Sequence, residues 1–140
     1  MKKLPIEIPK LLSLLGIVFL VILFWNTVFI FPLKLLVVLL HEISHGLAAI
    51  LTGGKIVSIE VNMNQGGLAT TIGGNRFFII SAGYLGSMIW GGTIMVLASR
   101  FSFDRQVAMV LGVGLALVGL IYVANFSGKA FTIAFSTLLI

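Results

Sequence analysis

Cysteine is missing from this 140-residue chain, and charged residues make up only 9% of it. Without cysteine the chain can form no disulfide and offers no thiolate to a metal ion. With so few charges and 59% hydrophobic residues, a soluble domain of this size could not cover its apolar surface. The composition therefore predicts an integral membrane protein.

Acidic residues are scarcer than basic ones, with four Asp and Glu against nine Lys and Arg. The basic residues stand singly between apolar runs, so they predict no nucleic-acid partner. Lys and Arg that flank membrane segments instead set the orientation of a chain, because they favour the cytoplasmic side. A cytoplasmic N-terminus in a multi-pass cell-membrane protein is favoured, since it keeps most of the basic residues inside: Lys2, Lys3, Lys10, Lys55, Arg76 and Lys129.

Long apolar runs divide the chain into membrane spans. A helix needs about 20 apolar residues to cross about 30 Å of hydrocarbon, and the predicted spans are residues 11–31, 33–52, 77–98 and 107–126. Pro32 is expected to separate the first two, because proline interrupts a helix. Residues 130–140 begin a fifth apolar segment that is too short to cross, as if the sequence were cut off within a span. The first run is too long for a signal peptide and is interpreted as an anchor.

The one sizeable polar stretch lies between the second and third spans. "KIVSIEVNMN" alternates apolar and polar residues, which is typical of a β-strand, and "NQGG" before "LATTI" predicts a turn and a returning strand. The fold class is therefore an all-α polytopic membrane protein with four spans and the start of a fifth. A membrane-associated β-hairpin over residues 55–72 interrupts it, and residues 1–140 form a single membrane-embedded domain.

Three ionisable residues stand inside the second span, in "LLHEISHG". His41 and His45, the only histidines, are four residues apart, so both imidazoles project from one helical face and can share a metal ion. Glu42 is placed as in zinc-hydrolase helices, where this neighbour takes a proton from water whose pKa zinc lowers towards neutrality. An ionisable group at the bilayer centre costs roughly 2.5–3.5 kcal/mol. We therefore predict a hydrolytic zinc site. A polar cluster without metal, and a metal site for another purpose, are the alternatives.

The stretches "HEISHGLAAILTGGKI" and "SAGYLGSMIWG", with the hairpin between them, resemble the site-2 protease family of intramembrane zinc metalloproteases, most of all its compact bacterial branch. The resemblance covers about residues 35–127. It implies that His41 and His45 bind zinc and that Glu42 is the catalytic acid and base. It also implies that the hairpin, from Lys55 to Ile72, holds a transmembrane protein substrate in extended form by strand addition, for cleavage near the cytoplasmic side.

The third metal ligand is missing from this pattern. A catalytic zinc site usually has three protein ligands and a water, and in this family the third is an aspartate in an "LDG"-like setting on a later span. No such motif occurs here, and the other acidic residues are Glu7, Glu60 and Asp104. Glu60 could swing from the hairpin towards the site, whereas Asp104 lies between two arginines and faces the other side of the membrane. We expect the third ligand beyond Ile140.

Three functions stay open at this point. The first is a zinc-dependent intramembrane endopeptidase that acts in regulated intramembrane proteolysis. The second is a catalytically incomplete scaffold or binding protein that keeps the protease fold, which the missing ligand favours. The third is a metal transporter, which the small number of polar residues in the third and fourth spans disfavours.

Small and polar residues in the later spans carry two further predictions. Gly83, Ser87 and Gly91 recur every four residues and predict a small face that packs on the helix of the two histidines. Asn125, at the inner end of the fourth span, is interpreted as a helix-end residue, with orientation of the substrate or of a ligand as the alternative.

Overall fold

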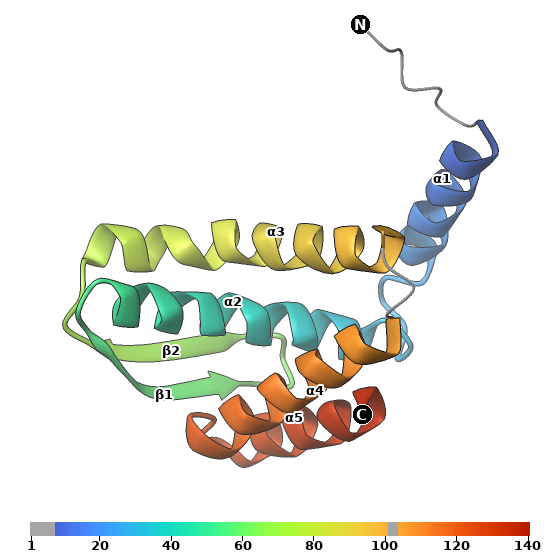
Figure 1. The fold of residues 1–140 in the computed structure, drawn as a ribbon. Helices are drawn as coiled ribbons and strands as arrows, with labels where there is room; N and C mark the ends of the chain where they lie inside the picture. The colour runs from blue at the N-terminus through green and yellow to red at the C-terminus, as the bar shows by residue number, and fades with distance from the viewer. Residues whose placement is uncertain (1–7, 101–103) are drawn as a thin grey trace, which may run out of the picture. The chain divides into compact units, whose positions relative to one another are not determined.

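The structure, a computed structural model, describes residues 8–100 and 104–140 and is mostly helical. Five helices and one two-stranded sheet follow one another as α1 (Ile8–Leu23), α2 (Phe31–Leu51), β1 (Lys55–Val61), β2 (Gly67–Ile72), α3 (Arg76–Arg100), α4 (Asp104–Ile121) and α5 (Phe126–Leu139) (Figure 1). The order confirms a helical chain with a hairpin between its second and third long helices. The chain divides into two compact units, residues 1–33 and 34–140, and each is described by itself.

The first helix is shorter than the apolar run that contains it. α1 ends at Leu23, and residues 24–30 form turns in which the Thr27 hydroxyl donates to the Phe24 carbonyl at 2.7 Å. Asn, Thr, Val and Ile in this stretch have lower helix propensities than the leucines before it. Pro32 lies in the first turn of α2, where a proline leaves no helical hydrogen bond unmade. The boundary predicted at Pro32 was therefore wrong. The first helix ends earlier, at Leu23, and Pro32 belongs to the first turn of the second helix.

Within the unit of residues 34–140, α2 lies between α3 and the hairpin (Figure 1). It supplies much of the buried core, including Leu35, Leu39 and Ala49. The helix ends at Leu51, and Gly53 just after it has a φ of 86°, a left-handed conformation that glycine adopts without strain. The Gly54 N–H then donates to the Ala49 carbonyl at 2.7 Å. The chain therefore leaves α2 in a defined direction, into β1.

The hairpin is antiparallel, with Lys55 opposite Ile72 at its base and Val61 opposite Gly67 near its turn. This agrees with the strand pattern of the sequence. The turn closes where the Asn62 N–H donates to the Gly66 carbonyl at 2.8 Å. At the base, the Thr52 hydroxyl oxygen accepts the Asn75 N–H at 2.9 Å, which ties the end of α2 to the start of α3.

The other edge of β1 is also partly paired. The Ile59 N–H donates to the Tyr122 carbonyl at 2.8 Å, and the Ala124 N–H donates to the Ile59 carbonyl at 2.9 Å. Val123, between them, forms a parallel bridge with Ile59. The segment 122–125, which joins α4 to α5, thus acts as a short third strand. The fourth helix therefore ends at Ile121 rather than at residue 126.

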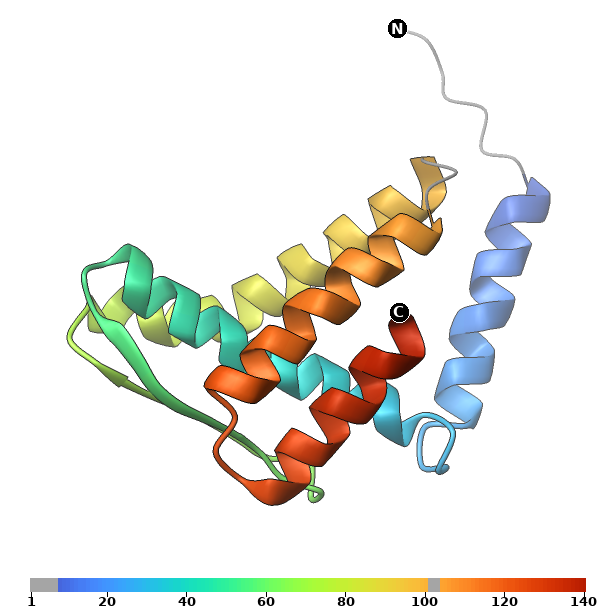
Figure 2. The same ribbon diagram turned by 60° about the horizontal axis from the view of Figure 1, so that its bottom comes forward.

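Helices α4 and α5 lie side by side and run in opposite directions (Figure 2). A side chain at Gly119 would clash with Thr132, so the absence of one lets the two helices approach closely. The hydroxyls of the buried residues Thr132 and Ser136 donate to carbonyls of their own helix, at 2.7 and 2.6 Å. The pair packs without leaving these polar groups unsatisfied.

Two helices of the described residues are long and apolar enough to cross a membrane by length and composition, namely Phe31–Leu51 and Arg76–Leu97. The other three apolar helical stretches, Leu11–Leu23, Arg105–Ile121 and Phe126–Leu139, have 10–17 residues. Four complete spans were predicted, so two of them correspond to helices that meet this length.

Candidate metal centre

His41 and His45 project from the face of α2 that packs on α3. Their ring centroids are 4.7 Å apart and their planes are nearly perpendicular, at 83°. If Gly83 of α3 carried a Cβ atom, the Nε2 atoms of both imidazoles would lie 2.5 Å from it. Both Nε2 atoms therefore lie next to the same point of α3, and they can approach it this closely because position 83 has no side chain.

The other ring nitrogens are held by α3, which determines the tautomers. His45 Nδ1 lies 2.6 Å from the Ile79 carbonyl oxygen, which can only accept, so Nδ1 carries the proton. His41 Nδ1 lies 3.3 Å from Ser87 Oγ, and the Ser87 hydroxyl donates its own proton to the Gly83 carbonyl at 2.7 Å. His41 Nδ1 is then the donor to Ser87. Both Nε2 atoms keep a free lone pair, as metal-binding histidines do when their other nitrogen donates.

This arrangement fits a metal ion. Two imidazoles with free Nε2 lone pairs lie next to the same point of α3, and hydrogen bonds to acceptors on this helix orient both rings. Imidazole is a ligand for zinc and for several other first-row metals. A complete zinc site needs one more protein ligand.

The third ligand is not supplied by the part of the chain that the structure describes. Within residues 8–100 and 104–140, no group of three His, Cys, Asp or Glu is arranged to hold a metal ion. Glu60, which was considered from the sequence, therefore does not complete the site. Asp104 begins α4, but its side chain and the whole of Glu7 lie outside the described residues.

Glu42 lies against the second strand of the hairpin. Its side chain is only 6% exposed, and a Cβ atom at Gly67 would collide with its carboxyl group. The carboxylate also accepts a hydrogen bond from the backbone N–H of Ala69. The carboxyl group is therefore held by β2, while its residue directly follows His41 and stands three residues before His45 in α2.

The hydrogen-bonding pattern of the hairpin shows on which side of β2 Glu42 lies. The backbone groups of Ile59 bond to Tyr122 and Ala124, so they point away from β2. In an antiparallel pair, two residues that stand opposite one another either both direct their N–H and C=O groups towards the partner strand or both direct them away from it. Ala69 is opposite Ile59, so its N–H points away from β1. Glu42 therefore lies at the outer edge of β2.

The sequence indicated some of these partners and missed others. Gly83 and Ser87 were recognised as members of a small face, and the structure shows that they contact the histidines. Gly91, the third member, has no atom within 4 Å of where its side chain would begin, so the seam ends before it. The Ile79 carbonyl could not be found, because a backbone acceptor has no signature in the sequence. Tyr84, whose ring centroid is 5.0 Å from that of His41, was quoted within the motif but given no role.

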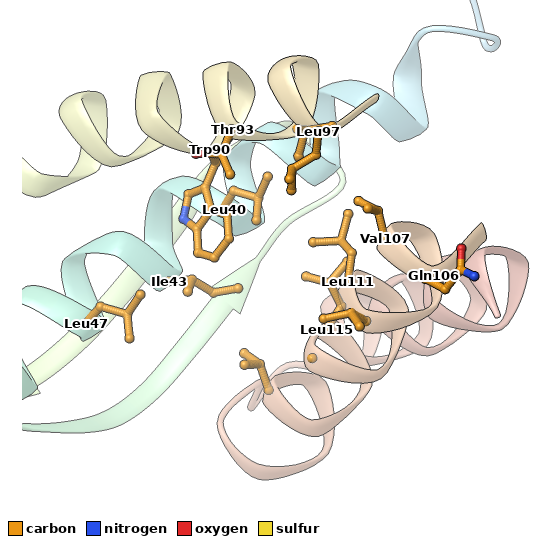
Figure 3. A pocket seen from close by; sticks show the side chains of 14 residues that line it. Leu40, Ile43, Leu47, Trp90, Thr93, Leu97, Gln106, Val107, Leu111 and Leu115 are labelled. Carbon is orange, nitrogen blue, oxygen red and sulfur yellow. The ribbon is translucent and has the colours of Figure 1, made fainter. Parts of the chain in front are cut away.

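A second feature of α2 is an apolar cavity of about 650 Å³ between α2, α3 and α4 (Figure 3). Leu40, Ile43 and Leu47 line it from α2, and Trp90 and Leu97 line it from α3. Among the residues that the structure describes, no imidazole or acidic side chain lines it. The cavity and the polar site therefore occupy different faces of the same helix.

The apolar helices and the polar face of α2 that carries His41, Glu42 and His45 define a membrane protein whose half-buried histidine pair suits a metallopeptidase. The chain belongs to the Peptidase M50B-like family, whose model matches residues 14–140. The family assignment is consistent with the site-2 protease family and confirms the resemblance found in the sequence. Comparison with curated proteins and with solved structures gives no match.

Proposed function

We propose that this protein is a zinc-dependent intramembrane endopeptidase that cleaves a membrane-spanning protein substrate. The observation that carries the proposal is that both Nε2 atoms, each left unprotonated by the bond of its Nδ1, lie next to the same point at Gly83, with Glu42 next to one of the two histidines in the sequence. Membership of a peptidase family supports the same chemistry.

In this proposal His41 and His45 would hold zinc, and the bound ion would supply Lewis-acid chemistry for the scissile carbonyl and the attacking water. Glu42 is the general base and acid: its carboxylate takes a proton from the attacking water and passes it to the leaving amine. Ile79 and Ser87 keep the imidazoles in the tautomer that leaves Nε2 free. The near-complete burial of Glu42 limits the access of bulk water to the reaction.

The substrate segment is proposed to bind as an extended strand on the outer edge of β2. Strand addition uses backbone groups that point away from the existing sheet, and Gly67 and Ala69 present such groups close to Glu42. The scissile peptide would then be brought to the general base by backbone pairing rather than by side-chain recognition. The proposed topology is multi-pass with a cytoplasmic N-terminus, which puts cleavage near the cytoplasmic side.

The test is metal analysis of the purified protein together with cleavage of a membrane substrate. His45→Ala should lose the zinc that the wild type binds, because one of two imidazoles is removed. Glu42→Gln should keep the zinc and lose cleavage, because the amide cannot take up the proton. A wild-type protein that binds no zinc, or a Glu42→Gln variant that cleaves normally, would overturn the proposal.

One observation favours a second candidate, an inactive scaffold with the protease fold. No third metal ligand is found among the residues that the structure describes. A scaffold would bind the membrane substrate without cleaving it, and binding would be unchanged in Glu42→Gln. Substrate capture without cleavage by the wild-type protein would identify this function.

A further inference from the structure

The Asn125 side chain bonds to the backbone of β1. Its Oδ1 accepts the Val61 N–H at 3.1 Å, and its Nδ2 donates to the Val61 carbonyl at 2.7 Å. Further contacts of Nδ2 reach Asn62 Oδ1 at 3.3 Å and Ser127 Oγ at 3.0 Å. The amide thus pairs with both backbone groups of one strand residue, as another strand would.

This bonding differs from the helix-end role predicted from the sequence. Asn125 is the N-cap residue of α5, but its side chain makes no capping hydrogen bond. Its amide is engaged by Val61, Asn62 and Ser127, which leaves little hydrogen-bonding capacity for a substrate. The side chain therefore acts on the hairpin and neither caps the helix nor contacts the histidines.

The register of the hairpin connects this contact to Glu42. Val61, held by Asn125, is directly opposite Gly67, and Gly67 lies against the Glu42 carboxyl group. Ile59, held by the backbone of the segment 122–125, is opposite Ala69, whose N–H donates to Glu42. The segment 122–125 thus fixes Ile59 and Val61 of β1. Their partners in β2 are the residues that contact the carboxylate of Glu42.

The space for the contact is provided by Gly128 of α5. A Cβ atom at position 128 would lie 2.6 Å from Asn125 Oδ1 and 2.9 Å from the Val61 carbonyl oxygen. Both atoms belong to the paired amide and backbone. The local sequence "NFSG" therefore combines an amide that bonds to β1 with a helix position that leaves room for it.

We propose that Asn125 is a positioning residue that holds β2 against Glu42 and so determines the orientation of the general base. It acts through Val61 and Gly67 and touches neither the histidines nor Glu42. The inference rests on the proposed endopeptidase function for its effect on activity. Its structural part, the dependence of the hairpin on Asn125, is independent of that function.

The first test removes the amide. The Asn125 side chain makes no capping bond that would be lost, and serine is as favourable as asparagine at an N-cap position, so Asn125→Ser should preserve the start of α5 while losing both bonds to Val61. We expect kcat to fall roughly 10- to 100-fold, because displacement of a catalytic group by about 1 Å costs about that much. KM should change little and bound zinc should be retained. Asn62→Ala, which removes only the 3.3 Å contact, is the matched control and should keep its kcat.

A second variant reaches the same contact from α5. Gly128→Ala puts a methyl group into the paired amide and should lower kcat like Asn125→Ser. Gly114→Ala, at a helical glycine with nothing within 4 Å of the added atom, is its control. If Gly128→Ala and Asn125→Ser both keep the wild-type kcat while Glu42→Gln is inactive, the inference is wrong and the proposed function stands.

A disulfide that restores the activity of Asn125→Ser would show that the variant had lost the position of the hairpin and not its structure as a whole. The chain has no cysteine, so Ile59→Cys with Val123→Cys introduces a single possible disulfide at a bridged pair. In the Asn125→Ser background, oxidation should restore kcat towards the value of the oxidised double-cysteine protein that retains Asn125. Failure of the formed disulfide to restore any activity would contradict the inference.

Hydrogen exchange provides the readout that needs neither zinc nor substrate. Asn125→Ser should speed amide exchange in β1 around Val61 and in β2 around Ala69, and Asn62→Ala should not. This result is expected even if the wild-type protein cleaves nothing, in which case only the proposed function fails. Unchanged exchange at both strands in Asn125→Ser would overturn the inference.

Discussion

At the scale of single residues, the space beside Gly83 determines whether two imidazoles can share one ion. His41 and His45 were predicted as ligands from their spacing alone, because residues four apart lie on one face of a helix. The spacing does not tell what packs against that face. In the structure it is α3, where a glycine lets both Nε2 atoms come within 2.5 Å of the position of a Cβ atom.

Gly83→Ala is expected to weaken zinc binding by roughly 10- to 100-fold, the usual effect of disturbing groups around a metal site. The added methyl group would occupy the space on which the two Nε2 atoms converge. Zinc titration of the purified variant measures the effect.

The matched control for this prediction is Gly91→Ala. It makes the same change on the same helix, but nothing lies within 4 Å of the added atom, so zinc affinity should remain that of the wild type. Equal zinc affinity in the two variants would show that the histidines bind their ion elsewhere.

At the scale of elements, the sequence pattern predicted the strands of the hairpin, whereas packing decided what lies along each of its edges. Alternation predicted both strands, because side chains of a strand point to opposite faces in turn. It did not predict which edge of the hairpin is free. The segment 122–125 occupies the edge of β1, and Glu42 lies at the edge of β2.

Ala69→Pro tests the role of that edge. Ala69 points its N–H away from β1, so a proline there removes no bond of the hairpin and proline is tolerated at such edge positions. We expect substrate cleavage to fall at least about tenfold, since the contact with Glu42 loses its donor and the proline ring obstructs a strand added at this edge.

The control keeps the donor at the same position. Ala69→Gly shortens the side chain and retains the N–H, so its rate of substrate cleavage should stay near that of the wild type. If Ala69→Pro cleaves as fast as Ala69→Gly, the substrate does not pair with the outer edge of β2.

At the scale of the whole molecule, the distribution of basic residues carries a prediction about topology. With the N-terminus in the cytoplasm, the loop between α1 and α2 faces outward and the base of the hairpin, next to the end of α2, faces the cytoplasm. Asn26→Cys should therefore react with a membrane-impermeant thiol reagent added outside intact cells, and Lys55→Cys, at the base of the hairpin, should react only after the cells are opened. The wild-type chain has no cysteine and gives no background. The reverse labelling pattern would contradict this orientation and the cytoplasmic site of cleavage.

The sequence by itself determined the membrane class, the helix that carries the site and the hairpin. Hydrophobicity and periodicity are properties of short stretches of sequence, so they can be read without knowing how the helices and strands pack. Helix ends were less certain: α1 ended before Pro32, because turn formation near Thr27 outweighed the apolar composition of residues 24–31.

Only the tertiary structure decided how the site is built. The Ile79 carbonyl, the space at Gly83 and the Asn125 amide come from segments far from His41 and Glu42 in the sequence. Backbone acceptors and empty space leave no mark in a residue pattern, and an asparagine at a helix end looks like a cap until its partner is known. Such contacts depend on the packing of separate elements, and for that reason the histidine pair was predictable and the groups that orient it were not.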